Sequence, residues 1–311
     1  MLPAEGSFHR ETPLEIILGI AAALGWGVAD FSARFATRRI GAYRTLMLMQ
    51  LFGFLALTIY LQETGVFQRG LASGWQPWIF AVLAGLMNTG ASLALYRSFE
   101  VGAISIAGPV SSAYPALTVA LALASGERIN LQRGAGMAIT FFGLILAAIS
   151  FMPDAAKDAQ PDPLARPDAG GTHLSKGAGW AIMAAVGYGV MFWWLGFHVV
   201  PLVGSAVSVW VVRISTFAAL ALAGLPSGRS LQLPRGNIWW LLLVVGLMDT
   251  AAFVMNNAGM GMGHVAVVSV LSSLYGAVTV LLSWIFLSER IERSQWLGIF
   301  LIFAGIVFVS L

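Results

Sequence analysis

Ten apolar stretches run through the chain, and they restrict its fold more than any other feature. A helix of about 20 apolar residues crosses the roughly 30 Å of hydrocarbon in a bilayer. The stretches lack the alternation of a barrel strand, and a helix satisfies its own backbone hydrogen bonds in lipid. We therefore expect ten transmembrane helices, approximately at 14–33, 45–61, 78–97, 103–124, 133–152, 177–197, 205–224, 238–257, 264–287 and 295–311.

Composition supports an integral, multi-pass membrane protein. Only 10% of the residues are charged and 58% are apolar, whereas soluble domains carry roughly 25% charged residues. The chain has no cysteine, which excludes a disulfide framework and a thiolate metal site. It has no long basic run, no HExxH motif and no carboxylate cluster with metal spacing. We therefore expect no nucleic-acid partner, no metal and no cofactor.

One polar stretch divides the ten helices into five and five. Residues 153–176 hold four prolines among several aspartates, a composition that cannot bury a core and is typical of a flexible linker. The start of the chain has acidic residues and a proline where a signal peptide needs basic ones. We expect an N-terminal tail at 1–13, a first five-helix unit at 14–152 and a second at 177–311.

The two units repeat one another at an offset of 161 to 163 residues. Because each unit has an odd number of helices, the second must enter the membrane from the opposite side, which makes an inverted repeat. Inverted repeats are common in secondary transporters, whose substrate site lies near the midplane between the repeats. The matched pairs include Trp26/Tyr188, Gln50/Arg213, Asn88/Asp249, Ser111/Ser272, Ser112/Ser273 and Tyr114/Tyr275.

The fourth and ninth helices end in the matching sequences GERI (126–129) and SERI (288–291), each followed by a glycine-containing helix. Together with the duplicated five-helix unit, this order and spacing resembles the EamA family of the drug/metabolite transporter superfamily. The resemblance covers the whole chain except the tail and the linker. It implies an all-α fold of ten helices around a central cavity, in a bacterial inner membrane. It also implies export of amino acids or other small metabolites, with sugars or drugs as the alternative substrates.

Two arguments about orientation disagree. The loops on one face carry twelve Lys and Arg residues and the loops on the other carry four, so the positive-inside rule places both termini outside. The family resemblance more often implies both termini inside. We expect only that the termini share a side.

Two charges lie near the middle of their helices, Arg213 and Asp249. An unpaired charge at mid-bilayer costs at least roughly 2.5–3.5 kcal/mol, so such residues are usually paired or functional. We expect the two to approach one another or to face one cavity, beside the matching amides Gln50 and Asn88. A substrate carboxylate would meet the guanidinium and an ammonium the carboxylate, and Asp249 is the candidate for proton coupling. The alternative is a buried ion pair that only orients two helices.

A third charge, Asp30, lies one turn before Arg34 near the expected end of the first helix. At this spacing acidic and basic side chains pair on a helix surface. We therefore favour a local pair at the membrane surface over a role with protons or substrate.

Aromatic and hydroxyl side chains complete the candidate substrate site. Trp26 and Tyr188 are flanked by glycines, which permit close approach, and the tyrosines and serines of the fourth helix are repeated in the ninth. The first copy has Pro109 and Pro115 where the second has Val270 and Gly276, so we expect the fourth helix to bend more sharply. The repeated candidates are Ser111, Ser112, Tyr114, Ser272, Ser273 and Tyr275.

These residues favour a secondary transporter that works by alternating access of its two repeats. The alternative is a membrane-embedded enzyme with a helix serine as nucleophile and His198 or His264 as base. Serines inside helices usually bond back to the preceding turn, and no oxyanion-hole motif accompanies them, so we expect no enzyme activity. The expected partners are a small-molecule substrate and the lipid bilayer. We expect a monomer, with a dimer through the glycine faces of the fifth and tenth helices as the alternative.

Overall fold

The computed structural model describes residues 13–67, 74–102, 104–149, 177–224, 234–287 and 293–310. The tail before residue 13 and the expected linker at 153–176 lie outside these residues. The first half, residues 13–149, forms helices α1 (Pro13–Ile40), α2 (Ala42–Thr64), α4 (Gln76–Val101), α5 (Ile104–Ser111), α6 (Pro115–Ala124) and α7 (Leu131–Ile149). The second half, residues 177–310, forms α8 (Ala178–Trp194), the π-helical turn η1 (Leu195–Val199), α9 (Val200–Val203), α10 (Ser205–Gly224), α11 (Ile238–Met260), α12 (Val265–Ser272), α13 (Tyr275–Leu287) and α14 (Arg293–Ser310).

These elements form ten helical passes at the ten expected stretches, because α5–α6, α8–η1–α9 and α12–α13 each continue one pass. Among the described residues, seven spans are long and apolar enough to cross a membrane. The expectation of an all-helical, multi-pass membrane protein is confirmed for the described part of the chain.

Single glycines make two of the turns between passes. Gly41 separates α1 from α2 with φ of 84°, and Gly204 separates α9 from α10 with φ of 83°. Side chains other than glycine rarely adopt this left-handed region. The two glycines occupy matching places in the two halves, and α1 extends to Ile40, well beyond the expected residue 33.

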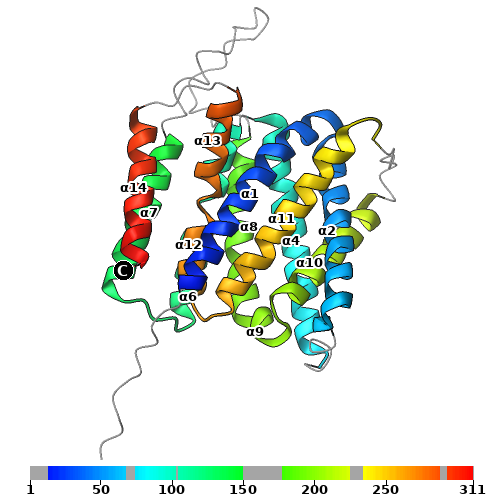
Figure 1. The fold of residues 1–311 in the computed structure, drawn as a ribbon, viewed down its shortest axis with the longest axis horizontal. Helices are drawn as coiled ribbons and strands as arrows, with labels where there is room; N and C mark the ends of the chain where they lie inside the picture. Colours follow the sequence, from blue (N-terminus) through cyan, green and yellow to red (C-terminus); the bar gives the residue numbers. More distant parts are fainter. Residues whose placement is uncertain are drawn as a thin grey trace, which may run out of the picture.

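The halves interlock instead of standing side by side. In Figure 1 the chain reverses direction at each turn, and α1 lies along α11 across the middle of the bundle. The packing is reciprocal: α1 packs on α11 and α13, and in the same way α8 packs on α4 and α6. Helix α2 packs on its counterpart α10, and α7 pairs with α14 at one side of the bundle (Figure 1).

Close helix contacts are reciprocal too. A Cβ atom added at Gly25 would lie 2.9 Å from the Cβ of Ala252, and one added at Gly187 would lie 2.9 Å from the Cβ of Ala91. Both distances are shorter than real Cβ contacts, so a larger residue would push the helices apart. Gly25 and Gly187, which match in the repeat, therefore make equivalent close contacts between the halves.

Both copies of the repeated serine-tyrosine helix are interrupted. The first breaks at 112–114, between α5 and α6, and the second at 273–274, between α12 and α13. At both breaks the backbone tightens to bonds three residues back, such as Tyr114 N–H to Ser111 O (3.3 Å) and Leu274 N–H to Leu271 O (3.3 Å). The second copy lacks the prolines of the first, so the proline argument does not explain the break.

Candidate functional site

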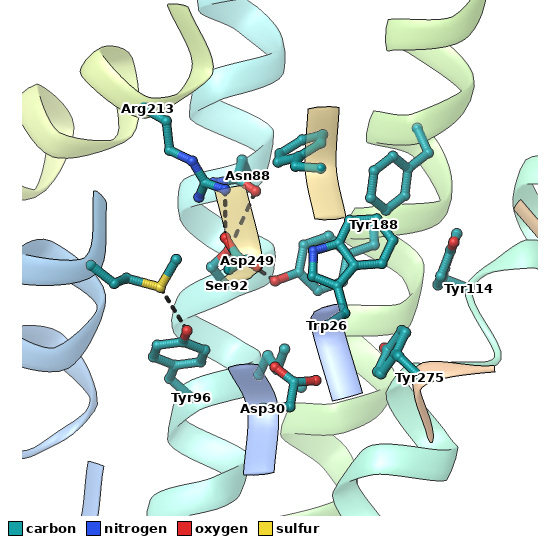
Figure 2. A pocket seen from close by; sticks show the side chains of 14 residues that line it. Trp26, Asp30, Asn88, Ser92, Tyr96, Tyr114, Tyr188, Arg213, Asp249 and Tyr275 are labelled. Atoms are coloured by element: carbon teal, nitrogen blue, oxygen red, sulfur yellow. Dashed lines mark hydrogen bonds and ion pairs between the residues drawn. The ribbon is translucent and has the colours of Figure 1, made fainter. Parts of the chain in front are cut away.

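A small cavity lies at the centre of the interlocked halves (Figure 2). Its volume is about 40 Å³, room for about three water molecules at the roughly 10–15 Å³ that one buried water needs. Both halves contribute side chains to it. The lining residues are Trp26, Asp30, Met49, Asn88, Ser92, Leu95, Tyr96, Tyr114, Tyr188, Phe192, Arg213, Asp249, Phe253 and Tyr275.

The Arg213 guanidinium forms a charged group at one end of this cavity. Its Nη2 donates to Asp249 Oδ2 at 2.5 Å and its Nη1 donates to Gln50 Oε1 at 2.7 Å. The Arg213 side chain is 1% exposed and the Asp249 side chain 18%. The guanidinium carbon also lies 5.4 Å from the centre of the Phe253 ring, within range of a cation–π contact. The expected approach of Arg213 to Asp249 is confirmed, whereas their role with substrate stays a prediction.

A chain of polar side chains surrounds Asn88, the position of the first half that matches Asp249. Asn88 Nδ2 donates to Thr216 Oγ1 at 3.1 Å, and Ser92 Oγ donates to Asn88 Oδ1 at 3.3 Å. The hydroxyls of Ser92 and Tyr188 are 2.8 Å apart. These bonds hold the amide of Asn88 and the ring of Tyr188 in fixed positions on the cavity wall (Figure 2).

The tyrosines at the two helix breaks form hydrogen bonds across the halves. Tyr275 Oη donates to Ser111 Oγ at 3.0 Å, and the hydroxyls of Tyr114 and Ser272 are 2.6 Å apart. The two rings are stacked with centroids 6.5 Å apart. Both bonds join matching positions, so each tyrosine is held by the serine of the other copy.

The four candidate serines lie outside the cavity lining. Ser111, Ser112, Ser272 and Ser273 are buried, and their described bonds run to backbone carbonyls and to the two tyrosines. Ser111 and Ser272 hold the two cavity tyrosines, and none of the four serines belongs to the cavity lining. His198 lies instead among aromatic rings. His264 lies beside Arg133 and Glu15.

Aromatic rings form the apolar side of the cavity. Trp26 lies 5.5 Å from Phe192, 6.1 Å from Phe253 and 6.1 Å from Tyr275, centroid to centroid. Tyr96 closes another side and donates its hydroxyl to the sulfur of Met49. Rings of this kind accept ligands with both apolar and polar parts.

Asp30 differs from the expectation. It is 5% exposed and lines the cavity, with its carboxylate in the space below Trp26 in Figure 2. Among the described residues no hydrogen bond or ion pair joins it to another side chain, Arg34 included. The prediction of a local surface pair was wrong because α1 continues to Ile40, which places Asp30 inside the bundle.

Sequence reasoning found half of this lining and missed residues that lie one helical turn further along. Residues four apart share a helix face, so a predicted lining residue can point to another one turn along. Adding four to the predicted positions finds four of the seven missed residues. The pairs are Trp26 and Asp30, Asn88 and Ser92, Tyr188 and Phe192, and Asp249 and Phe253.

A second charged cluster joins the halves at the end of the bundle where α1 begins (Figure 1). Arg133 Nη2 donates to Glu15 Oε1 at 3.3 Å, and Glu15 Oε2 lies 3.9 Å from His264 Nε2. Glu127 accepts the backbone N–H of Ala266 at 3.1 Å, in the first turn of α12, where a carboxylate is favoured by the helix dipole. Burial raises the pKa of Glu127, and this hydrogen bond partly offsets the rise.

Known proteins are similar to this chain in sequence and in fold. Residues 13–149 and 175–311 match the model of the EamA-like transporter family. A protein of Methanocaldococcus jannaschii, described as uncharacterized protein MJ1333.1, is 29% identical over 136 residues, which cover 43% of this chain and 96% of that protein. That relative is therefore about as long as one half of this chain.

The fold is similar to that of a solved crystal structure. The two superpose with a TM-score of 0.71 at 20% identity, over 95% of this chain and 96% of the other. At this identity the likeness concerns the fold alone. The family match, in contrast, spans both halves and nearly the whole sequence, and it agrees with the multi-pass helical structure. The chain therefore belongs to the EamA-like transporter family, and is an integral membrane protein of a family that transports small molecules.

Proposed function

We propose that the protein is a secondary transporter that moves a small metabolite by alternating access of two inverted five-helix repeats. The antiparallel passes and the reciprocal packing of α1 on α11 and α8 on α4 support an inverted relation between the halves. A pair of such units can rock against each other around a fixed central site.

The observation that carries the proposal is that the cavity is lined from matching positions of both halves. Trp26 faces it from α1 and Tyr188 from α8, while Asn88 faces it from α4 and Asp249 from α11. A site shared in this way stays bounded by both repeats whichever way they tilt. The charged cluster of Glu15, Arg133 and His264 then acts as a closed contact at one end, which must part when that end opens.

The proposed substrates are amino acids, whose carboxylate would meet Arg213 while the aromatic rings contact the side chain. Arg213 already holds Asp249 and Gln50, so a substrate carboxylate binds by taking over hydrogen bonds of the guanidinium. Release of Asp249 would let it accept a proton. Each elementary charge moved across the membrane gains about 2.3 kcal/mol per 100 mV, enough to drive uphill transport.

Transport by the purified protein in proteoliposomes tests this function. Labelled amino acids, sugars and nucleosides are supplied at two pH values, and we expect uptake of at least one amino acid. Arg213→Gln and Asp249→Asn should each abolish that uptake while the protein is still expressed and inserted. Glu63→Gln, at the exposed end of α2, is the control that should transport normally. Full activity in both cavity variants would contradict the proposed role of the pair.

A further inference from the structure

One carboxylate in the cavity has no counter-charge. Arg213 and Asp249 neutralise one another, whereas Asp30 is 5% exposed and has no hydrogen bond or ion pair with a described residue. The two carboxylates and the guanidinium that line the cavity therefore leave one negative charge in excess when all three are ionised. The matching residue of the second half is Phe192, so the cavity contains this feature once.

A buried ionised carboxylate is costly unless a positive charge compensates it. Here the Arg213 guanidinium is already occupied by two hydrogen bonds, so Asp30 is neutralised either by a proton that it binds or by a cation that enters the cavity. The aromatic rings around Asp30 also favour a positively charged ligand. Trp26 and Tyr275 lie 6.1 Å apart, edge to face, above and beside the carboxylate in Figure 2, and aromatic faces attract cations.

We propose that Asp30 is the binding site for a cationic nitrogen, the ammonium of the transported molecule, with Trp26 and Tyr275 beside it. The positive end then lies at Asp30 and the apolar body extends toward Phe192 and Phe253. As a description of the transported substrate, this rests on the proposed function; as a statement about binding, it stands on the cavity alone.

The chemistry of the cavity lining favours an organic cation over a metal ion. The described residues contain no group of three side chains of the kinds that hold a metal, and aromatic rings offer a metal ion no oxygen ligands. An ammonium needs only one carboxylate and the ring faces. The selected molecules therefore carry a positive amine, and a free carboxylate adds nothing to binding at Asp30.

The test measures binding of four matched ligands to the purified full-length protein in detergent, by calorimetry and tryptophan fluorescence. Phenethylamine carries a ring and an ammonium, phenethyl alcohol is neutral, 3-phenylpropionate is anionic and phenylalanine is zwitterionic. We expect phenethylamine to bind about tenfold or more tightly than the alcohol and the propionate, because a charge-assisted bond is lost in both. Equal binding of the amine and the alcohol, or no binding of the amine, overturns the proposal.

Variants at Asp30 locate the effect. Asp30→Asn keeps the shape and should weaken phenethylamine about tenfold or more, while Asp30→Glu keeps most of the affinity. The melting temperature and gel-filtration profile show whether each variant is folded. If the asparagine variant does not fold, the ligand series on the unaltered protein and the glutamate variant still decide the matter. Undiminished amine binding to folded Asp30→Asn contradicts the proposal.

Two further experiments distinguish an organic cation from sodium, and the proposed site from the proposed transport function. Sodium chloride and choline chloride are titrated against bound phenethylamine; displacement by choline at concentrations where sodium has no effect supports an organic-cation site, and displacement by sodium alone contradicts it. Uptake that continues unchanged in Asp30→Asn leaves transport intact and refutes Asp30 as a binding site for the transported substrate. Amine binding that depends on Asp30, without uptake of any substrate in proteoliposomes, keeps the site and refutes the transport function.

Discussion

The two halves contribute matching positions to one cavity and yet differ there in charge. The first half has the neutral amides Gln50 and Asn88 where the second has Arg213 and Asp249. At another matched pair the difference is reversed, because Asp30 of the first half corresponds to Phe192 of the second. Every ionisable carboxylate or guanidinium in the lining therefore lies opposite an uncharged copy of its own position.

Positions that join the halves show no such difference. Gly25 approaches Ala252 as Gly187 approaches Ala91, and the tyrosine-serine bonds are exchanged between the copies. The contacts that join the halves are therefore alike in both copies, whereas the charges that line the cavity differ. The alternating access that we propose would need such equal contacts, so that the repeats can tilt either way with similar energies, whereas binding of a substrate would need one particular set of charges.

The largest expected effect comes from making one charged position of the second half resemble the first. Arg213→Gln copies Gln50 and leaves Asp249 in the cavity without its counter-ion. Breaking a buried ion pair from one side costs about 3–5 kcal/mol, and the partial exposure of Asp249 places this variant at the lower end, about 3 kcal/mol. Denaturation of the purified protein in mixed detergent measures the loss.

The double variant Arg213→Gln with Asp249→Asn separates charge from shape. It gives the second half the neutral amides of the first, so no charge remains unpaired, and we expect it to recover most of the lost stability. Transport should stay absent. Recovery of transport would show that the pair only orients α10 and α11.

The next largest effect is a loss of about 1–3 kcal/mol in the free energy of unfolding, and it concerns the close contacts that the halves share. A Cβ atom at Gly189 of α8 would lie 2.9 Å from the carbonyl oxygen of Tyr114 and 2.8 Å from the Cβ of Leu117. Gly189→Ala should therefore destabilise the protein by about that amount through overpacking. Gly27→Ala, its copy in α1, should do the same against Val278.

Gly179→Ala is the matched control in α8, because nothing lies within 4 Å of its added Cβ. It should be neutral or stabilising by up to about 1 kcal/mol, since alanine is the better helix former. A large loss in only one of Gly27→Ala and Gly189→Ala would show that the two contacts are not equivalent.

The sequence was sufficient for the helical passes and for much of the cavity because both depend on local periodicity and on the repeat. The length of the apolar stretches located the spans. The charges within the spans pointed to Arg213 and Asp249, and the offset between the copies matched Tyr114 to Tyr275. Asp30 was misjudged since the end of α1 had to be estimated, and a helix extending to Ile40 carries that carboxylate into the bundle. Whether a side chain such as Ser111 faces the cavity or a tyrosine behind it depends on packing between the halves, which no local pattern contains.

The smallest effect tests whether the crossed tyrosine bonds are equal. Tyr114→Phe removes the bond to Ser272, and Tyr275→Phe removes the bond to Ser111. A buried hydrogen bond contributes about 1 kcal/mol, so each variant should lose about that amount in the same denaturation experiment. Tyr114 also donates toward the carbonyl oxygen of Ser269 at 3.1 Å, which makes its loss the greater of the two. If the double variant loses the sum of the single effects, the bonds act independently; a smaller loss means that one break relaxes the other, and the two helix breaks then move as one unit. Unchanged stability in all three variants would remove the crossed bonds from the contacts that hold the halves together.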